Sequence, residues 1–137
     1  MSEGFLSKTA LSPVNSSPKV AIVIPVCDVA PYLEDCLDSV LRQTFSNFQI
    51  FAVDDKSSDS SPSILKKYIE EDDRVSALLL DQRKGVSNAR NEALEQIETA
   101  AEFDYVAFVD SDDIVEPAYL ENLVKKSVET SSDITVC

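Results

Sequence analysis

The chain has 137 residues, a length that suits one domain with a sizeable hydrophobic core. Its 44% hydrophobic and 27% charged residues are typical of a soluble globular protein rather than a disordered one. The net charge of -13 argues against a nucleic-acid surface and gives no basic patch for anionic lipid. The chain contains no His, so it cannot supply a His metal ligand, a His base or a His-containing triad.

The cysteines and the N-terminal segment bear on cellular location. Cys27, Cys36 and Cys137 are odd in number and match no zinc-binding spacing, which favours a reducing, cytoplasmic compartment. Any contact with the inner face of the membrane would then use missing regions or partners. The longest apolar run, Val20 to Val26, is too short to span a bilayer. Residues 1–18 lack the pattern of a signal peptide and are rich in Ser and Pro, so we expect a flexible arm.

The domain itself is expected over residues 19–137, where short apolar runs alternate with segments of helical periodicity. In chain order, the pattern predicts a strand at 20–24 ended by Pro25, a helix from Pro31, a strand at 48–53, a helix with Pro62 in its first turn, a strand at 75–80, a helix at about 87–99, a strand at 105–109, a helix opened by Pro117 and a strand from 134. Strands alternating with amphipathic helices predict an α/β fold with an open, mostly parallel sheet.

Acidic residues follow two of these strands. The run from Tyr105 to Val109 stops at three carboxylates within four residues, Asp110, Asp112 and Asp113. Crowded carboxylates repel one another, and a hard divalent cation with its preference for oxygen ligands would compensate them. The alternative is a polar loop that caps the next helix. Because parallel strands end on one edge of the sheet, the pair Asp54-Asp55 and the run from Asp110 should converge there, which favours a ligand site.

The kind of ligand is narrowed by the scarcity of glycine. Gly4 and Gly85 are the only glycines, so neither a glycine-rich dinucleotide fingerprint nor a phosphate-binding loop is present. Phosphate would then be bound through a metal held by Asp110 to Asp113. Asp54-Asp55 could accept hydrogen bonds from a base or a ribose. Together these features indicate a nucleoside diphosphate with a further group attached.

Five ordered blocks then carry a family resemblance. They are Val23-Ile24-Pro25-Val26, Tyr32 to Phe45, Val53-Asp54-Asp55 with Ser57-Ser58-Asp59, Gly85 to Asn91, and Phe108 to Asp113. In order and spacing the chain resembles the Rossmann-like, nucleotide-binding half of a family 2 glycosyltransferase of the GT-A fold. The resemblance implies a UDP-type sugar donor, Mn²⁺ or Mg²⁺, and inverting transfer of the sugar to a glycan, lipid or other acceptor in polysaccharide biosynthesis.

The resemblance also implies roles for residues around the nucleoside. Pro25 and Val26 would line the nucleoside pocket through their backbone. Asp55, with Asp54 beside it, would contact the uracil. Asp28 would lie near the nucleoside, where the family usually has Asn.

The remaining implied roles concern the diphosphate. Asp112 would reach the ribose or the metal, and Asp110 and Asp113 would serve the metal and the diphosphate. Arg90 would lie on the donor side, near the base or phosphate. The alternative for Arg90 is an exposed helix residue that pairs with a glutamate of its own helix.

The sequence departs from the family pattern at three places, which comprise four residues. Cys27-Asp28 replaces a usual Tyr-Asn, which removes an aromatic ring and adds a charge near the nucleoside. Lys56 replaces a frequent Gly, which would tolerate a positive φ that Lys adopts only at a cost. Arg83 stands where Asn is usual. Lys56 and Arg83 can partly balance the acidic crevice, or they can be solvated loop charges.

The end of the sequence lies inside an expected apolar strand. We therefore expect a chain truncated at its C-terminus, with the catalytic base and the acceptor-binding elements beyond Cys137, and little transfer by these residues alone. Two rival functions remain open. One is a non-catalytic nucleotide-binding or assembly module. The other is a phosphoacceptor receiver domain, which fits less well because Asp54-Asp55 follows the second strand rather than the first.

Overall fold

A mostly parallel sheet dominates the computed structural model, which describes residues 5–8, 18–130 and 134–136. The strands of this described part are β1 (Phe5–Lys8), β2 (Val20–Val26), β3 (Phe48–Asp54), β4 (Val75–Leu79), β5 (Tyr105–Phe108) and β6 (Ile134–Val136). Its helices are α1 (Ala30–Leu41), α2 (Ser61–Glu71), α3 (Val86–Ala100) and α4 (Tyr119–Thr130). Every strand and helix expected between residues 20 and 130 is present, with ends shifted by one or two residues.

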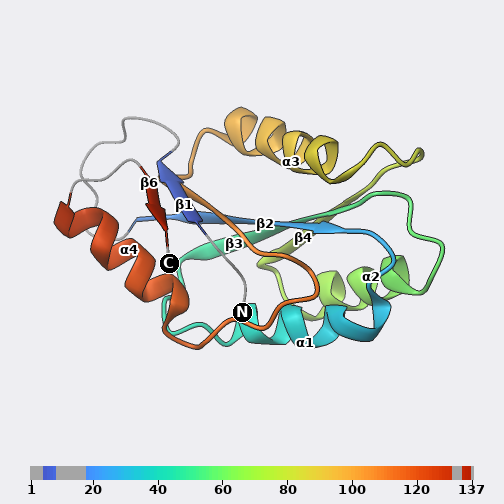
Figure 1. Cartoon of the computed structure of the whole chain (residues 1–137), viewed down its shortest axis with the longest axis horizontal. Coiled ribbons are helices and arrows are strands. Elements are labelled where there is room, and N and C mark those ends of the chain that lie inside the picture. Colours follow the sequence, from blue (N-terminus) through green and yellow to red (C-terminus); the bar gives the residue numbers. More distant parts are fainter. Residues whose placement is uncertain (1–4, 9–17, 131–133, 137) are drawn as a thin grey trace.

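The strand order in the sheet is β4-β3-β2-β5-β1-β6. The first four of these strands pair in parallel, as the sequence predicts. Their carboxyl ends therefore lie along one edge of the sheet, and this edge carries the loops that follow β2, β3, β4 and β5 (Figure 1).

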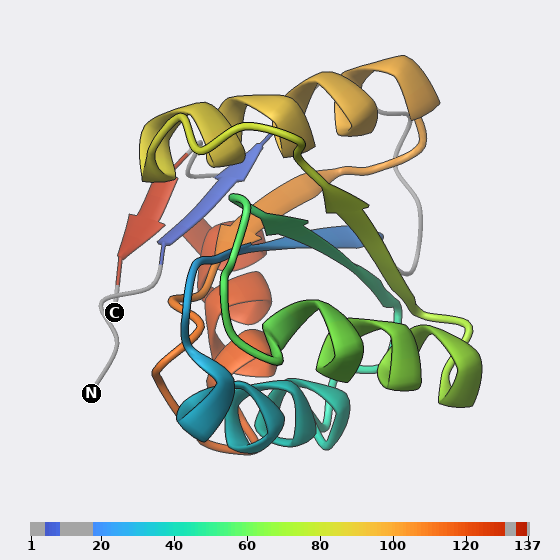
Figure 2. The same ribbon diagram turned by 90° about the vertical axis from the view of Figure 1, so that its right-hand side faces the viewer.

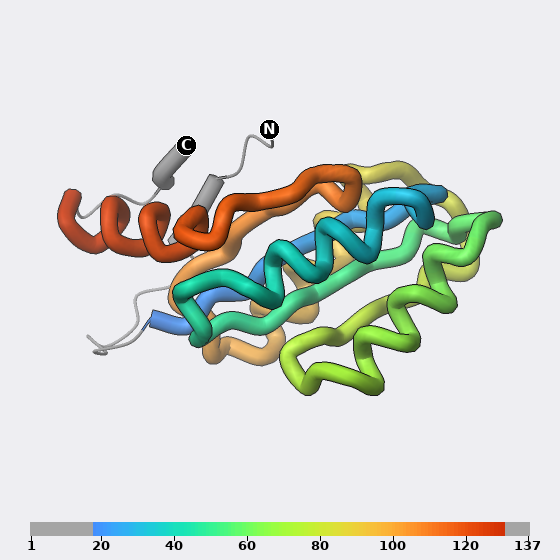
Figure 3. The backbone as a smooth tube through the Cα atoms, turned by 90° about the horizontal axis from the view of Figure 1, so that it is seen from below, coloured from blue at the N-terminus to red at the C-terminus, as the bar shows by residue number. Residues whose placement is uncertain are grey.

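Helices cover both faces of the sheet. Figures 1 and 2 show α3 on one face, with α1, α2 and α4 on the other. Seen from below in Figure 3, the latter three helices lie in front of the strands. Alternate residues of β2 serve the two layers, because Ile22 and Ile24 pack with α1 whereas Ala21 and Val23 pack with α3. The central strand is thus buried on both faces, which explains its continuous apolar sequence.

The prediction of a flexible arm at residues 1–18 is wrong for Phe5–Lys8. These residues form β1, which pairs antiparallel with β5 on one side and with β6 on the other. Without β1, the N–H and C=O groups on the outer edge of β5 would lack sheet partners. A four-residue strand is too short to produce a recognisable alternation. Residues 9–17 lie outside the described part, and the division between arm and domain stays a prediction.

Pro25 does not end β2 as predicted. The strand continues to Val26, and Pro25 stands opposite Val53 in the parallel pairing with β3. Proline removes one N–H donor from the ladder, but the Val26 carbonyl still accepts from the Asp55 N–H at 2.8 Å. β2 therefore runs two residues further toward the carboxyl edge of the sheet than predicted. In the described residues, no helix is both long and apolar enough to cross a bilayer.

Candidate functional site

A pocket of about 320 Å³ opens at the carboxyl edge of the parallel strands. Its walls are Pro25, Val26, Cys27, Val29, Asp55, Val86, Ala89, Asp110, Ser111 and Asp112. The pocket thus joins the loops after β2 and β3 to the start of α3 and to the loop after β5. Five of the predicted site residues line it directly, and the other four, Asp28, Asp54, Arg90 and Asp113, stand outside its wall.

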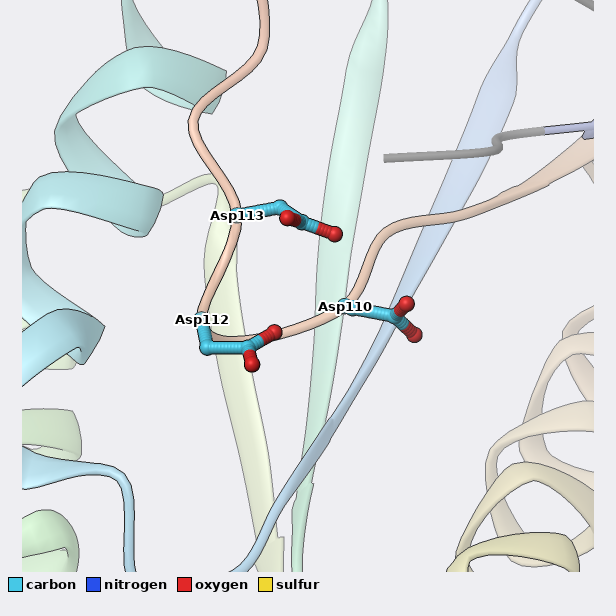
Figure 4. A group of neighbouring side chains, drawn as sticks. All are labelled: Asp110, Asp112 and Asp113. Atoms are coloured by element: carbon cyan, nitrogen blue, oxygen red, sulfur yellow. The ribbon is translucent and has the colours of Figure 1, made fainter. Parts of the chain in front are cut away.

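The acidic loop after β5 brings three carboxylates together. One oxygen from each of Asp110, Asp112 and Asp113 lies within 4.8 Å of the others. Figure 4 shows Asp112 and Asp113 projecting from the loop toward the side where Asp110 lies. The Asp113 N–H donates to the Asp110 carbonyl at 3.1 Å, which folds the loop into a turn. The turn gathers three anionic oxygens beside the pocket, a ligand set that suits a hard divalent cation.

Arg90 brings a positive charge into contact with this cluster. Its Nη2 lies 3.4 Å from the Asp110 Oδ1, so α3 and the loop after β5 are joined across the pocket. Both side chains are more than a third exposed, and the pair itself contributes little to stability. Within the described residues, the Arg90 Nε is buried without a hydrogen-bond partner. The contact to Asp110 places Arg90 on the acidic side of the pocket rather than on a glutamate of its own helix.

The side chain of Asp55 is held by the loop after β4. Its two carboxylate oxygens accept from the backbone N–H groups of Lys84 and Gly85, both at 2.8 Å, and the residue is only 3% exposed. Asp54 is buried as well, and one of its oxygens accepts from the Ser57 N–H at 3.0 Å. Its other oxygen has no hydrogen-bond partner in the described part of the chain. Asp55 therefore faces the pocket, whereas Asp54 supports the loop after β3.

Asp28 lies in the loop after β2, between Cys27 and Val29, which line the pocket. One of its oxygens accepts from the Ser58 N–H at 2.6 Å, and the other lies 2.6 Å from the Arg83 guanidinium. The Ser58 N–H and then the Arg83 guanidinium lower the pKa of Asp28 from its ordinary value. Both oxygens of this exposed carboxylate are thus already bonded within the protein. Asp28 and Lys56 both adopt left-handed backbone conformations, with φ of 50° and 56°.

Two thiols lie close to the site. Cys27 lines the pocket, half-buried, and its Sγ lies 3.7 Å from the Asp55 carbonyl. Burial raises the pKa of Cys27 above its ordinary value. Cys36 is fully buried in α1, and its burial, reinforced by the charges of Asp113, Asp112 and Asp110, raises its pKa to about 12. Cys36 is therefore a core residue, as expected, and Cys27 is a thiol that reports on the pocket.

The acidic loop is anchored by buried polar side chains that the sequence analysis did not single out. Gln43, just after α1, donates to the Glu116 carbonyl at 2.6 Å and accepts from the Leu120 N–H at 2.8 Å. Ser39 accepts from the Val115 N–H at 3.1 Å. Both side chains are buried, although nothing in the helical periodicity distinguishes a polar anchor from a tolerated polar residue. The sequence signal that could have indicated these anchors is the presence of polar residues within the block Tyr32 to Phe45.

Gln43→Ala should lower the free energy of unfolding by roughly 1–3 kcal/mol, because it leaves the buried Leu120 N–H without an acceptor. The measurement is urea unfolding followed by circular dichroism. Gln96→Ala, at an exposed position of α3, is the matched control and should change stability by less than about 0.5 kcal/mol. Equal effects of the two substitutions would contradict the anchoring role of Gln43.

Comparison with known families identifies the chain. The family model described as "Glycosyl transferase family 2" matches residues 21–137. The chain belongs to glycosyltransferase family 2. This membership confirms the resemblance found in the ordered blocks of the sequence, and the matched residues include both acidic clusters.

Both a sequence relative and a solved structure match the chain. The chain is 43% identical to "Glycosyltransferase GlyA" of Streptococcus pneumoniae over 119 residues, which cover 86% of the chain and 16% of that relative. Among solved structures, S. aureus TarS 1–349 matches with a TM-score of 0.74 and 30% identity, over 84% of this chain and 34% of that one. The expected GT-A type of fold is thereby confirmed. The chain spans about a sixth of GlyA and about a third of TarS 1–349.

A third likeness shows the fold alone. The mannosyltransferase PcManGT of Pyrobaculum calidifontis, solved in complex with GDP-Man and Mn²⁺, matches with a TM-score of 0.71 and 24% identity. It covers 81% of this chain and 32% of its own. The fold is thus shared with a solved structure of quite different sequence.

Proposed function

We propose that the chain forms the donor site of a glycosyltransferase, which binds a UDP-type nucleotide sugar together with a divalent cation. The observation that carries the proposal is that one continuous pocket is lined by Pro25 and Asp55 and also by Asp110 and Asp112. One end offers backbone and a carboxylate acceptor for a nucleoside. The other end offers a carboxylate cluster for a metal and the diphosphate that it would bind.

The nucleoside end comprises the two strand ends around Pro25 and Asp55. Pro25 and Val26 present backbone and apolar surface, and Asp55 is held in a fixed orientation by two amides. A carboxylate oxygen fixed in this way can still accept from the N–H of a pyrimidine, because each oxygen has a second lone pair. TarS 1–349 has been solved in complex with UDP and with UDP-GlcNAc, and its likeness to this chain supports the same donor class here.

The metal end fits Mn²⁺ or Mg²⁺. Asp110, Asp112 and Asp113 would hold the ion, since their oxygens lie within 4.8 Å of one another and carboxylates are the ligands that these ions prefer. When bound, the ion supplies positive charge for the departing diphosphate. Arg90 adds a fixed positive charge on the same side through its contact with Asp110.

Sugar transfer by this family member would go with inversion to a glycan, lipid-linked or other acceptor. We assign no catalytic base among the described residues, because the site carboxylates already serve the donor and the metal. Inversion requires an acceptor hydroxyl held in line behind the sugar carbon, with a base in hydrogen-bond reach. The chain therefore provides the leaving-group side of the reaction.

Alkylation of Cys27 tests this placement of the donor. UDP with Mn²⁺ should slow the reaction of Cys27 with iodoacetamide about tenfold when UDP is present at ten times its dissociation constant. The rate is read by mass spectrometry in a Cys137→Ser background. Because the pKa of Cys27 is raised, its thiolate fraction should keep increasing above the pH at which an ordinary thiol is already fully ionised. The alkylation rate should increase with it.

Cys36 is the internal control, since it is fully buried and should stay unmodified under every condition. Chelation of the metal should abolish most of the protection by UDP. An unchanged rate at Cys27 with saturating UDP and Mn²⁺ would contradict a donor site in this pocket.

A further inference from the structure

Three loops meet beside the base end of the pocket, and one side chain connects them. The loops follow β2, β3 and β4. Arg83, in the third loop, places its Nη2 2.6 Å from the Asp28 Oδ2 in the first loop and 3.2 Å from the Lys56 carbonyl in the second. Arg83 therefore contacts two other residues that depart from the family pattern, Asp28 and Lys56, so these departures lie together rather than scattered over the surface.

The first two loops are also tied to each other. The Asp28 N–H donates to the Ser57 Oγ at 2.9 Å, and the Asp28 carboxylate accepts from the Ser58 N–H. The left-handed conformations of Asp28 and Lys56 persist only when neighbouring groups hold them, and such a conformation is less costly for Asp than for Lys. Arg83 contacts both of these residues, so it stabilises the two strained positions together.

The third loop carries the groups that orient Asp55. Lys84 and Gly85 follow Arg83 directly, and their N–H groups donate to the two oxygens of Asp55. Residues 81–87 are all exposed, so the loop has little packing of its own to fix it. Its position depends on the Asp55 carboxylate from one side and on the Arg83 contacts from the other.

We propose that Arg83 is a positioning residue for the base of the donor: its bridge to Asp28 fixes the Lys84 and Gly85 amides, and through them the carboxylate of Asp55. This inference rests on the proposed donor site. It deepens that proposal, because it assigns to the departing residues Asp28, Lys56 and Arg83 a common task at the base end. If Arg83 acts through this bridge, uridine binding should also depend on Asp28. If Arg83 contacts the donor directly, uridine binding should not depend on Asp28.

The test compares Arg83→Gln, Asp28→Asn, the double variant and Arg83→Lys. Lys66→Gln is the matched control, since it removes the same charge from an exposed position of α2 that does not line the pocket. The first readout is amide hydrogen exchange at Lys84 and Gly85 without nucleotide, measured by NMR. The second is affinity for uridine, compared with affinity for pyrophosphate in the presence of Mn²⁺.

Each single neutral variant should speed exchange at Lys84 and Gly85 and weaken uridine binding by about two- to fivefold, the range expected for an exposed ion pair. The double variant should lose no more than either single one, because both remove the same bridge. Arg83→Lys should recover part of the loss, and Lys66→Gln should lose nothing. Pyrophosphate binding should stay unchanged in all of them.

Loss of uridine binding in Arg83→Gln with none in Asp28→Asn would overturn the proposal and assign Arg83 to direct contact with the donor. Unchanged exchange at Lys84 and Gly85 would overturn it as well. Failure of the proposed function is a separate result, since it would appear as absent uridine and UDP binding in the unaltered chain whatever the exchange rates show.

Discussion

Replacing Asp112 and Asp113 together by Asn should weaken UDP binding in Mn²⁺ by on the order of 100-fold, while the metal-independent part of binding stays the same. Asn keeps the size of each side chain and one oxygen, but it removes two of the three charges that lie within 4.8 Å of one another. A divalent cation would then have a single carboxylate ligand left in the cluster. The measurement is calorimetric titration with UDP at fixed Mn²⁺.

The same double variant has a second expected effect, opposite in sign. Without metal, the crowded carboxylates repel one another, so their neutralisation should leave the thermal midpoint unchanged or raise it. Added Mn²⁺ should stabilise the unaltered chain and not the variant. Glu70→Gln with Asp73→Asn, at two exposed positions, removes the same charge and is the control. A loss of UDP affinity in this control as large as in the site variant would show a general charge effect instead of a metal site.

Asp55→Ala should weaken the binding of uridine itself by about 10- to 100-fold. A hydrogen bond to a charged acceptor typically contributes about 1.5–3 kcal/mol, which corresponds to one to two decades in affinity. The substitution also frees the Lys84 and Gly85 amides, which now donate to Asp55 at 2.8 Å. Because both residues are exposed, water can replace the lost acceptor, and we expect the fold to survive with roughly 1–3 kcal/mol less stability.

Asp55→Asn separates the two consequences. It keeps one oxygen as an acceptor for the loop and should retain most of the stability, yet it presents an amide to the base and should still weaken uridine binding. Affinities for uridine and for pyrophosphate with Mn²⁺ are measured side by side by NMR titration. Pyrophosphate binding should be nearly unaffected in both variants. Unchanged uridine affinity in Asp55→Ala would remove Asp55 from the nucleoside pocket.

The shared edge of the site was predictable because a parallel sheet follows from simple periodicity. Continuous apolar runs such as Val20 to Ile24 mark strands buried on both faces, and the acidic residues after β3 and β5 must then lie on the carboxyl edge. The pocket between Asp55 and Asp110 bears this out. The roles of the individual site residues toward a ligand stay predictions.

Other features depend on long-range contacts that no local pattern records. β1 is a strand because β5 offers an unpaired edge about a hundred residues later in the chain, with Leu6 opposite Ala107. The Arg83 contact to Asp28 joins residues 55 positions apart. Each of the two residues departs from the family pattern, but only the fold shows that the departures touch.

The roles of buried polar residues are also not predictable from the local sequence pattern. Gln43 occupies a position that helical periodicity leaves neutral, and its importance comes from the Glu116 carbonyl and the Leu120 N–H at the far end of the acidic loop. A backbone group that lacks a partner in its own helix or strand must find one elsewhere. Here Ser39 of α1 and Gln43, two residues past its end, supply these partners, so the helix that follows β2 also fixes the loop after β5.

Calorimetric titration of the unaltered 137-residue chain with UDP, in Mn²⁺, in Mg²⁺ and in excess EDTA, tests the central claim most directly. The account predicts clear binding with either metal and a loss of most of the affinity in EDTA, because the crowded oxygens of Asp110, Asp112 and Asp113 would otherwise face the diphosphate unscreened. Equal UDP affinity with metal and with chelator would contradict a metal-dependent donor site at the acidic loop.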